Sequence, residues 1–420
     1  MRTLYPGERG VLVQYVQLAL VRAGYTVRID GIFGDETCAS LREFSERDTC
    51  EVDEEVWDML LPYLKGYQIH QVRNNDTIWS IANKYKTRIQ YIMTANPRID
   101  NRNLRPGQFL YIPLNYSIVS QEVAYSSLMN EWVIEGLLVR FPFFVAGSIG
   151  KSILGRDLLY IQIGKGDKEV FYNASFHANE WITTPLLLKF AEEYGQSIAT
   201  GESLYNVRAS WLFYNYRLYL VPMVNPDGVD LVNGIIKEGP SYEYARRIAA
   251  NYENIPFPSG WKANIEGVDL NLQFPAGWEQ AKAIKYANGY KGPAPRDYVG
   301  PSPLSEPESR AVYNFTIMHN FSLILAYHTQ GEVIYWRYLD YEPEGSRGIA
   351  QYFGIVSGYE VEETPSVSGY AGYKDWFILA FNRPGYTIEV GKGINPLSME
   401  QFPKIYKDNR LILEGGMTEI

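Results

Sequence analysis

The stretch EVFYNASFHANEW (169–181) decides the fold, because an apolar run typical of a buried strand ends at a possible metal-binding pair. Residues 169–176 are apolar, β-branched and aromatic, and a helical pattern follows at 184–194. Three more buried-strand patterns come later in the chain, at 217–224, 322–328 and 383–390. Strands that alternate with helices predict an α/β layer structure.

The four histidines of the chain differ in their surroundings. His177 and Glu180 are separated by two residues where a strand gives way to a turn, so both side chains can face one metal ion. His328 ends another apolar strand, and sites in open α/β sheets collect at the carboxyl ends of strands. Two His and one Glu form a catalytic zinc set, with one position left for water. We expect no metal role for His70 or His319.

Six segments around these residues resemble the M14 family of zinc carboxypeptidases in order and spacing. They are IGKSILGRDLLYIQIG (149–164), SFHANEW (175–181), VPMVNPDGVDL (221–231), GVDLNLQFP (267–275), AYHTQG (326–331) and TIEVG (387–391). The resemblance implies a metallocarboxypeptidase-like fold over residues 118–420, with a mixed eight-stranded sheet flanked by helices. It also implies one Zn2+ per chain, bound by His177, Glu180 and His328.

The same resemblance implies roles for three further charged residues. Glu389 matches the family's general base, which takes a proton from water and passes it to the leaving amine. Asp269 matches the carboxylate that orients the first His ligand. Lys262 stands where the family usually has an Arg that stabilises the oxyanion, and Lys supplies the charge without the planar fork.

Two positions depart from the family pattern in the region that binds substrate. Asn271 is kept as a substrate-binding residue, but Leu272 replaces the Arg that holds the terminal carboxylate of the substrate. Asn179 stands where the animal enzymes often have Arg, and we expect it to contact substrate. Because an apolar side chain cannot pair with a carboxylate, strict removal of C-terminal residues is not expected.

Lys374 in YKDW occupies the family's specificity position, in the pocket for the first residue after the cut. A Lys there suits a carboxylate-bearing side chain, such as the far end of diaminopimelate; alternatively, its amine extends to solvent. The family's mobile catalytic Tyr has no clean match, because the count falls on Val367. Tyr370 or Tyr373 could substitute.

The first 64 residues have helical patterns on either side of a Gly-rich turn, DGIFGDET (30–37). This segment resembles the peptidoglycan-binding domain of type 1, a three-helix fold; the alternative is a small helical spacer. The matching residues are Asp30, Gly31, Phe33, Gly34, Thr37 and Trp57.

Residues 66–114 read as strand, helix, helix and strand, and resemble a LysM module. DTIWSIA (76–82), ANP (95–97) and RPGQFLYIP (105–113) carry the resemblance. It implies binding of N-acetylglucosamine-containing glycan in a groove between two loops. The implied glycan-binding residues are Asp76, Thr77, Ile78, Asn96, Pro97 and Ile99.

The composition and charge of the chain bear on which classes of partner it can bind. The 420 residues carry a net charge of −9 with no basic stretch, so nucleic acid is not an expected partner. No run of 18 apolar residues predicts a membrane span, and the N-terminus has no apolar signal core. We expect a cytoplasmic protein or one released without a standard signal. Cys38 and Cys50 are expected as free thiols, with a disulfide as the alternative.

Wall-binding modules joined to this peptidase resemble the bacterial γ-D-glutamyl-L-diamino acid endopeptidases. The expected substrate is therefore the peptidoglycan stem peptide, cut between D-glutamate and the diamino acid, and a role in sporulation or recycling would fit. Three alternatives stay open. They are a plain metallocarboxypeptidase, a wall-binding protein with an inactive peptidase domain, and a chitin-binding protein.

Overall fold

The computed structural model describes residues 1–365 and 367–420, which fall into two compact units. The first unit comprises residues 1–123 and 131–145, and the second comprises residues 124–130 and 146–420. Helix α6 (Ser127–Arg140) contributes residues to both units. None of the described helices is both long enough and apolar enough to span a membrane.

The first unit begins with three helices, α1 (Val11–Ala23), α2 (Asp35–Ser45) and α3 (Glu54–Lys65). Buried Gln17 organises the Gly-rich turn, because its amide donates to Asp30 Oδ1 and Thr37 Oγ1 at 2.9 and 3.0 Å. It also accepts from the N–H of Gly31, whose φ of 70° suits a residue without a side chain. The turn residues therefore stabilise the three-helix arrangement. That arrangement was predicted from the sequence.

Cys38 and Cys50 form a disulfide, and no described cysteine is free. The expectation of two free thiols was wrong, and the alternative is confirmed. The sequence showed no metal-type spacing, but it could not show that α2 and the segment before α3 bring the two residues together.

The rest of the first unit contains a two-stranded antiparallel sheet and two short helices. They follow as β1 (Tyr67–Gln71), α4 (Ile78–Lys84), α5 (Ile89–Ala95) and β2 (Phe109–Pro113). Thr77 caps α4 through a reciprocal pair of bonds with Ser80. Ile81, Ile92 and Leu110 are among the residues of its small core. This order confirms the predicted strand–helix–helix–strand module.

The second unit is built on a mixed eight-stranded sheet with the order β3-β4-β6-β5-β7-β10-β8-β9. Its four central strands β6, β5, β7 and β10 are parallel, whereas β4 and β8 pair antiparallel with their central neighbours. The strands are β3 (Val145–Lys151), β4 (Asp157–Ile163), β5 (Lys168–Ala174), β6 (Tyr216–Val221), β7 (Phe321–His328), β8 (Val333–Tyr335), β9 (Glu360–Glu362) and β10 (Gly385–Glu389). The predicted fold class is confirmed.

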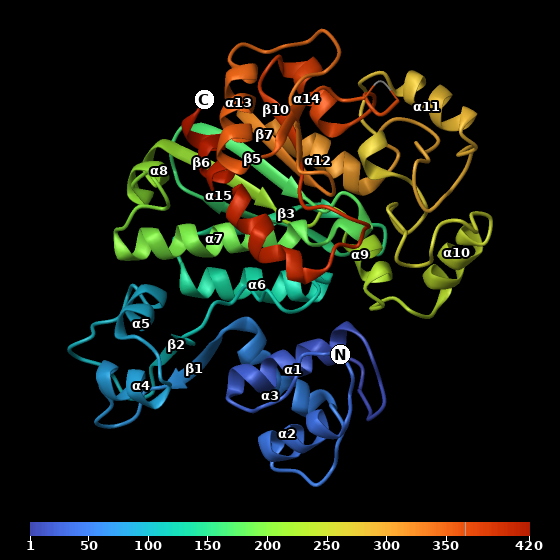
Figure 1. Ribbon diagram of the computed structural model, residues 1–420. Coiled ribbons are helices and arrows are strands. Elements are labelled where there is room, and N and C mark those ends of the chain that lie inside the picture. Colours follow the sequence, from blue (N-terminus) through green and yellow to red (C-terminus); the bar gives the residue numbers. More distant parts are fainter. Residues whose placement is uncertain (366) are drawn as a thin grey trace. The chain divides into compact units, whose positions relative to one another are not determined.

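Helices cover both faces of this sheet (Figure 1). After α6, the second unit contains the helices α7 (Thr183–Thr200), α8 (Ala209–Asn215), α9 (Pro226–Val232), α10 (Pro240–Ala249), α11 (Trp278–Ala287), α12 (Pro307–Met318), α13 (Ser346–Ser357), α14 (Tyr373–Phe381) and α15 (Phe402–Thr418). It also contains the 3-10 turns η1 (Ala178–Glu180), η2 (Leu270–Leu272) and η3 (Met399–Gln401).

Strand β5 shows why its sequence is apolar throughout. Successive side chains of a strand point to opposite faces. Phe171 packs with Phe315 of α12 and Tyr373 of α14, whereas the Tyr172 hydroxyl donates to the Leu413 carbonyl of α15 at 2.9 Å. Both faces of the central sheet are therefore buried, which leaves the carboxyl edge of its strands as the place for a site.

Candidate functional site

Three parallel strands bring the predicted metal ligands and the predicted base to one edge of the sheet. His177 and Glu180 follow the end of β5, in and just before η1. His328 is the last residue of β7, and Glu389 is the last residue of β10. The register of β10 against β7 pairs Glu389 directly with His328. Segments far apart in sequence thus meet because parallel strands end together.

The three predicted ligands form a compact, buried donor set. Candidate ligand atoms of His177, Glu180 and His328 all lie within 4.8 Å of one another. The two Nδ1 atoms are 3.2 Å apart, and each lies 2.9 Å from an oxygen of Glu180. Ligand atoms around a tetrahedral zinc ion lie about 3.3 Å apart. The number, type and spacing of these atoms therefore fit zinc.

Asp269 orients the first of these histidines. Its Oδ1 lies 3.1 Å from His177 Nε2, the ring nitrogen that faces away from Glu180. The N–H of Asn271 donates to the same carboxylate oxygen, and the N–H of Asp297 donates to the other. Burial opposes ionisation, but His177 outweighs it and holds the pKa of Asp269 well below its usual range. Asp269 therefore has the position predicted for it.

Lys262 lies against the same cluster, with its amine 3.1 Å from Glu180 Oε1. Burial lowers the pKa of Lys262, but the charges of Glu180 and Asp269 outweigh burial and raise it. Likewise, burial lowers the pKa of His177, whereas Glu180 and Asp269 raise it to about 9. Metal ligation requires a deprotonated imidazole, so protons compete with a metal ion at this site.

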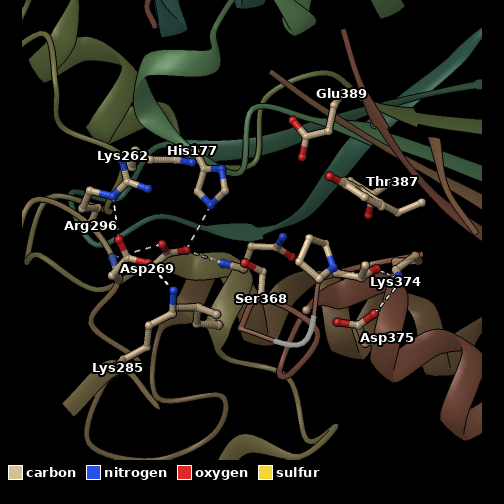
Figure 2. A pocket seen from close by; sticks show the side chains of 17 residues that line it. His177, Lys262, Asp269, Lys285, Arg296, Ser368, Lys374, Asp375, Thr387 and Glu389 are labelled. Carbon is tan, nitrogen blue, oxygen red and sulfur yellow. Dashed lines mark hydrogen bonds and ion pairs between the residues drawn. The ribbon is translucent and has the colours of Figure 1, made fainter. Parts of the chain in front are cut away.

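Glu389 lines the pocket beside this cluster (Figure 2). Burial and the negative charge of Glu180 raise the pKa of Glu389 to about 8, and Lys262 acts in the opposite direction. A cation at the donor set would stabilise the carboxylate form and lower this pKa. Its carboxylate can therefore exchange protons near neutral pH, as a general base must.

The pocket has a volume of about 250 Å3. Of the predicted site residues it is lined by His177, Lys262, Asp269, Asn271, Lys374 and Glu389. Leu272 also lines it, where the family has an Arg. The structure thus brings together residues from strand ends, η2 and α14, with an apolar side chain at the predicted carboxylate position.

Lys374 is held inside the protein. Its side chain is 4% exposed, and its amine donates to the Arg337 carbonyl at 2.6 Å and to Thr364 Oγ1 at 3.0 Å. Asp375 Oδ1 lies 2.7 Å away and balances its charge. The alternative in which this amine extends to solvent was wrong, because buried acceptors hold it at the pocket wall.

Asn271 lies at the pocket, whereas two other predicted substrate-binding residues do not. Asn271 Oδ1 accepts from the Tyr373 N–H, and its Nδ2 is 3.5 Å from His328 Nε2. Asn179 is buried, and its amide donates to the Ser259 carbonyl at 3.4 Å. Neither Asn179 nor Tyr370 is among the described residues that line the pocket. The structure does not support a substrate contact for either of them.

The two tyrosines that could substitute for the family's mobile Tyr are both packed against other side chains of the second unit. Tyr370 packs with Leu272 and Trp278 in a small apolar cluster. Tyr373 is fully buried, with its hydroxyl 2.9 Å from Thr316 Oγ1. A tyrosine locked in this way cannot swing over a substrate.

The predicted glycan-binding residues of the LysM module mostly shape its loops. Asp76 accepts from the Arg73 N–H and lies 2.9 Å from His70 Nε2. Asn96 is buried and bonds both the N–H and the carbonyl of Tyr111. The remaining predicted residues are the helix cap Thr77, the core residues Ile78 and Ile99, and the exposed Pro97.

Sequence reasoning missed three charged residues of the pocket. Lys285 of α11 forms an ion pair with Asp297, and the Arg296 Nε lies 2.6 Å from the same carboxylate. All three line the pocket. Arg296 and Asp297 lie in a loop without a strand end or a motif, so the sequence gives no signal for them. Their place beside the site follows from the hydrogen bond that the Asp297 N–H donates to Asp269.

Comparison with known proteins identifies two regions of the chain. The zinc carboxypeptidase family model matches residues 129–411, and the LysM domain model matches residues 70–113. Gamma-D-glutamyl-L-diamino acid endopeptidase 1 of Lysinibacillus sphaericus is 41% identical over 402 residues, which cover 82% of this chain and 98% of that protein. The Bacillus subtilis protein YqgT is 42% identical over 315 residues, or 74% of this chain and 81% of that protein.

Solved structures agree on the fold. Carboxypeptidase A from Helicoverpa armigera superposes with a TM-score of 0.53 at 18% identity, over 84% of this chain and 98% of that chain. The family model covers the strands that carry the donor set, the predicted base Glu389 and also Asp269. The chain belongs to the zinc carboxypeptidase family and carries a LysM domain.

Proposed function

We propose that this protein binds one zinc ion through His177, Glu180 and His328, and hydrolyses the γ-D-glutamyl–diamino acid bond of peptidoglycan stem peptides. The observation that carries the proposal is a complete metallopeptidase donor set beside the apolar Leu272. The relative from Lysinibacillus sphaericus supports the bond, because its name specifies that linkage and it aligns over 98% of its length.

The residues of the pocket divide the chemistry among them. When bound, zinc would polarise the scissile carbonyl and acidify the attacking water. Glu389 accepts the proton of that water and returns it to the leaving amine. Lys262 stabilises the negative charge that develops on the carbonyl oxygen, and Asp269 holds His177 in the tautomer that a metal needs.

Leu272 bears on the choice between an endopeptidase and a carboxypeptidase. A carboxypeptidase must pair the terminal carboxylate of its substrate with a cation beside Asn271. Leu272 supplies only apolar surface, and the nearby Lys374 is already paired with Asp375. A substrate that continues beyond the diamino acid meets no such requirement, which favours cleavage within the stem peptide.

The first unit supplies attachment in this proposal. The LysM module binds N-acetylglucosamine-containing glycan, and the three-helix domain acts as a peptidoglycan-binding domain of type 1. Attachment to glycan raises the concentration of stem peptides around the catalytic pocket without adding chemistry. The protein is expected to act on the cell wall or on released muropeptides.

The test uses zinc-loaded protein with L-Ala-γ-D-Glu-meso-diaminopimelate, with and without a following D-Ala. We expect release of L-Ala-D-Glu from both peptides, and loss of activity after removal of zinc with a chelator. Cleavage at the end of the longer peptide alone would instead indicate a carboxypeptidase. Absence of cleavage by zinc-loaded protein would exclude both peptides as substrates.

A further inference from the structure

Arg296 is the cation of the pocket whose hydrogen-bonding capacity is least used. Lys374 is bonded to three acceptors, Lys285 is paired with Asp297, and Lys262 faces the ligand Glu180. Arg296 uses only Nε, which bonds Asp297, and within the described chain its two terminal nitrogens have no hydrogen-bond partner. Its side chain is 44% exposed and lines the pocket, so the open fork can meet a solute.

The backbone around Arg296 is fixed relative to the metal ligands. The N–H groups of Lys262 and Ala263 both donate to the Pro295 carbonyl, at 2.7 and 2.9 Å. The N–H of Asp269 donates to the Tyr298 carbonyl at 2.8 Å. Residues 295–298 are thus bonded to the Lys262 segment and to the residue that orients His177, which preorganises Arg296.

Asp297 completes this support. It has a left-handed backbone conformation, with a φ of 65°, that a residue other than glycine rarely adopts. In this conformation its N–H donates to Asp269 Oδ2 at 3.2 Å, while its carboxylate bonds Arg296 Nε and Lys285. The Asp297 carboxylate faces two cations, Arg296 and Lys285, and cannot neutralise both.

Arg296 lies across the pocket from Lys374. Figure 2 shows Arg296 near Lys262 at one side, with Lys374 and Asp375 at the other. The resemblance of YKDW to the family's specificity position assigns Lys374 to the residue after the cut, which leaves the opposite wall for the residue that supplies the carbonyl. In a γ-D-glutamyl peptide that residue carries a free α-carboxylate a few bonds from the scissile carbonyl.

We propose that Arg296 binds the α-carboxylate of the D-glutamyl residue through its two terminal nitrogens, and so selects substrate with a free α-carboxylate over substrate in which that group is amidated. This inference rests on the proposed function. A guanidinium matches a carboxylate with two parallel charge-assisted hydrogen bonds, which neither an amide nor a lysine reproduces. The family's Arg, which pairs with the terminal carboxylate after the cut, is replaced here by Leu272. Arg296 supplies a cation before the cut, where it pairs with the glutamyl α-carboxylate.

The test compares two peptides that differ only at this group. They are L-Ala-γ-D-Glu-meso-diaminopimelate and its analogue with the glutamyl α-carboxylate converted to a carboxamide. The wild type should prefer the carboxylate by about 10- to 100-fold in kcat/KM. Arg296→Gln should lose that preference through a fall on the carboxylate peptide alone, and Arg296→Lys should recover part of it. Arg247→Gln, on the exposed face of α10, should match the wild type.

A binding measurement separates recognition from turnover. In the Glu389→Gln background, calorimetry should show tighter binding of the carboxylate peptide, and addition of Arg296→Gln should abolish the difference at unchanged zinc content. Equal losses on both peptides, or a wild type without preference, would overturn the assignment of Arg296. If the wild type cleaves neither peptide, the proposed function itself has failed and the inference fails with it.

Discussion

At the scale of single residues, the site is defined by what each charged group is bonded to. His177 faces Glu180 with one nitrogen and Asp269 with the other, so its orientation is fixed from both sides. Lys262 stands against Glu180, and Glu389 lies beside His328 through strand register. These contacts explain why substitutions that alter one hydrogen bond should change zinc affinity or rate without unfolding the protein.

Asp269→Asn should weaken zinc binding by about 10- to 100-fold, because an amide orients His177 less strongly and carries no charge. Competition with a chromophoric chelator measures this affinity. Asp157→Asn is the matched control, since Asp157 pairs with Lys151 at the exposed edge of the second unit. An unchanged affinity in Asp269→Asn would show that Asp269 does not support the metal ligand.

Lys262→Met should lower kcat by about 100- to 1,000-fold, with a smaller change in KM, because the oxyanion loses its nearest cation. Lys262→Arg should retain much of the activity, since Arg keeps the charge. Steady-state kinetics on L-Ala-γ-D-Glu-meso-diaminopimelate measure these changes. The zinc content of each variant is checked first. Loss through KM alone would mean that Lys262 binds substrate and does not stabilise the transition state.

At the scale of elements, the strand ends were predictable and the loops between them were not. An apolar run that stops at His or Glu predicts both a buried strand and a site at its carboxyl end, which identified β5, β7 and β10. The strand–helix–helix–strand order of residues 66–114 was similarly predictable from local patterns, and the motifs in it carried the resemblance to LysM. Such signals are local in sequence, so a single chain suffices to detect them.

The parts that escaped prediction depend on contacts between distant segments. Arg296 and Asp297 reach the site only because residues 295–298 bond to Asp269 and Lys262. Cys38 and Cys50 form a disulfide across a turn that spacing alone did not specify. Lys374 carries no sequence signal for its buried acceptors, Arg337 and Thr364.

Helix α12 contains a buried carboxyl group that makes stability depend on pH. Glu308 accepts from the Ile153 N–H, but its other oxygen has no partner among the described residues. Burial raises its pKa from 4.5 to about 8. The folded state therefore holds a proton that the unfolded state releases above its lower pKa, so this stabilisation is complete below pH 4.5 and is lost as pH rises towards 8.

Glu308→Gln should remove this dependence, because an amide stays neutral. Relative to the wild type, the variant should gain stability on the order of 5 kcal/mol at pH 9 and little at pH 5. Calorimetric melting of both proteins across this range measures the difference. A constant difference at all pH values would show that Glu308 does not titrate between these limits.

At the scale of the whole molecule, the proposed function assigns attachment to one compact unit and chemistry to the other. Every described residue that lines the pocket belongs to the second unit, whereas the LysM module belongs to the first. If the LysM module holds the chain on glycan, soluble N-acetylglucosamine oligomers should slow hydrolysis of intact wall. They should leave hydrolysis of a free tripeptide unchanged. Equal effects on both substrates would contradict this division of roles.

The measurement that tests the central claim most directly is hydrolysis of L-Ala-γ-D-Glu-meso-diaminopimelyl-D-Ala in water enriched in oxygen-18. Mass spectrometry then identifies the carbonyl that the water attacked. The account predicts the heavy oxygen in the γ-carboxyl of L-Ala-D-Glu, with none in the diaminopimelate fragment, and loss of the product in Glu389→Ala. Heavy oxygen in a tripeptide that has lost D-Ala would contradict the account and identify a carboxypeptidase.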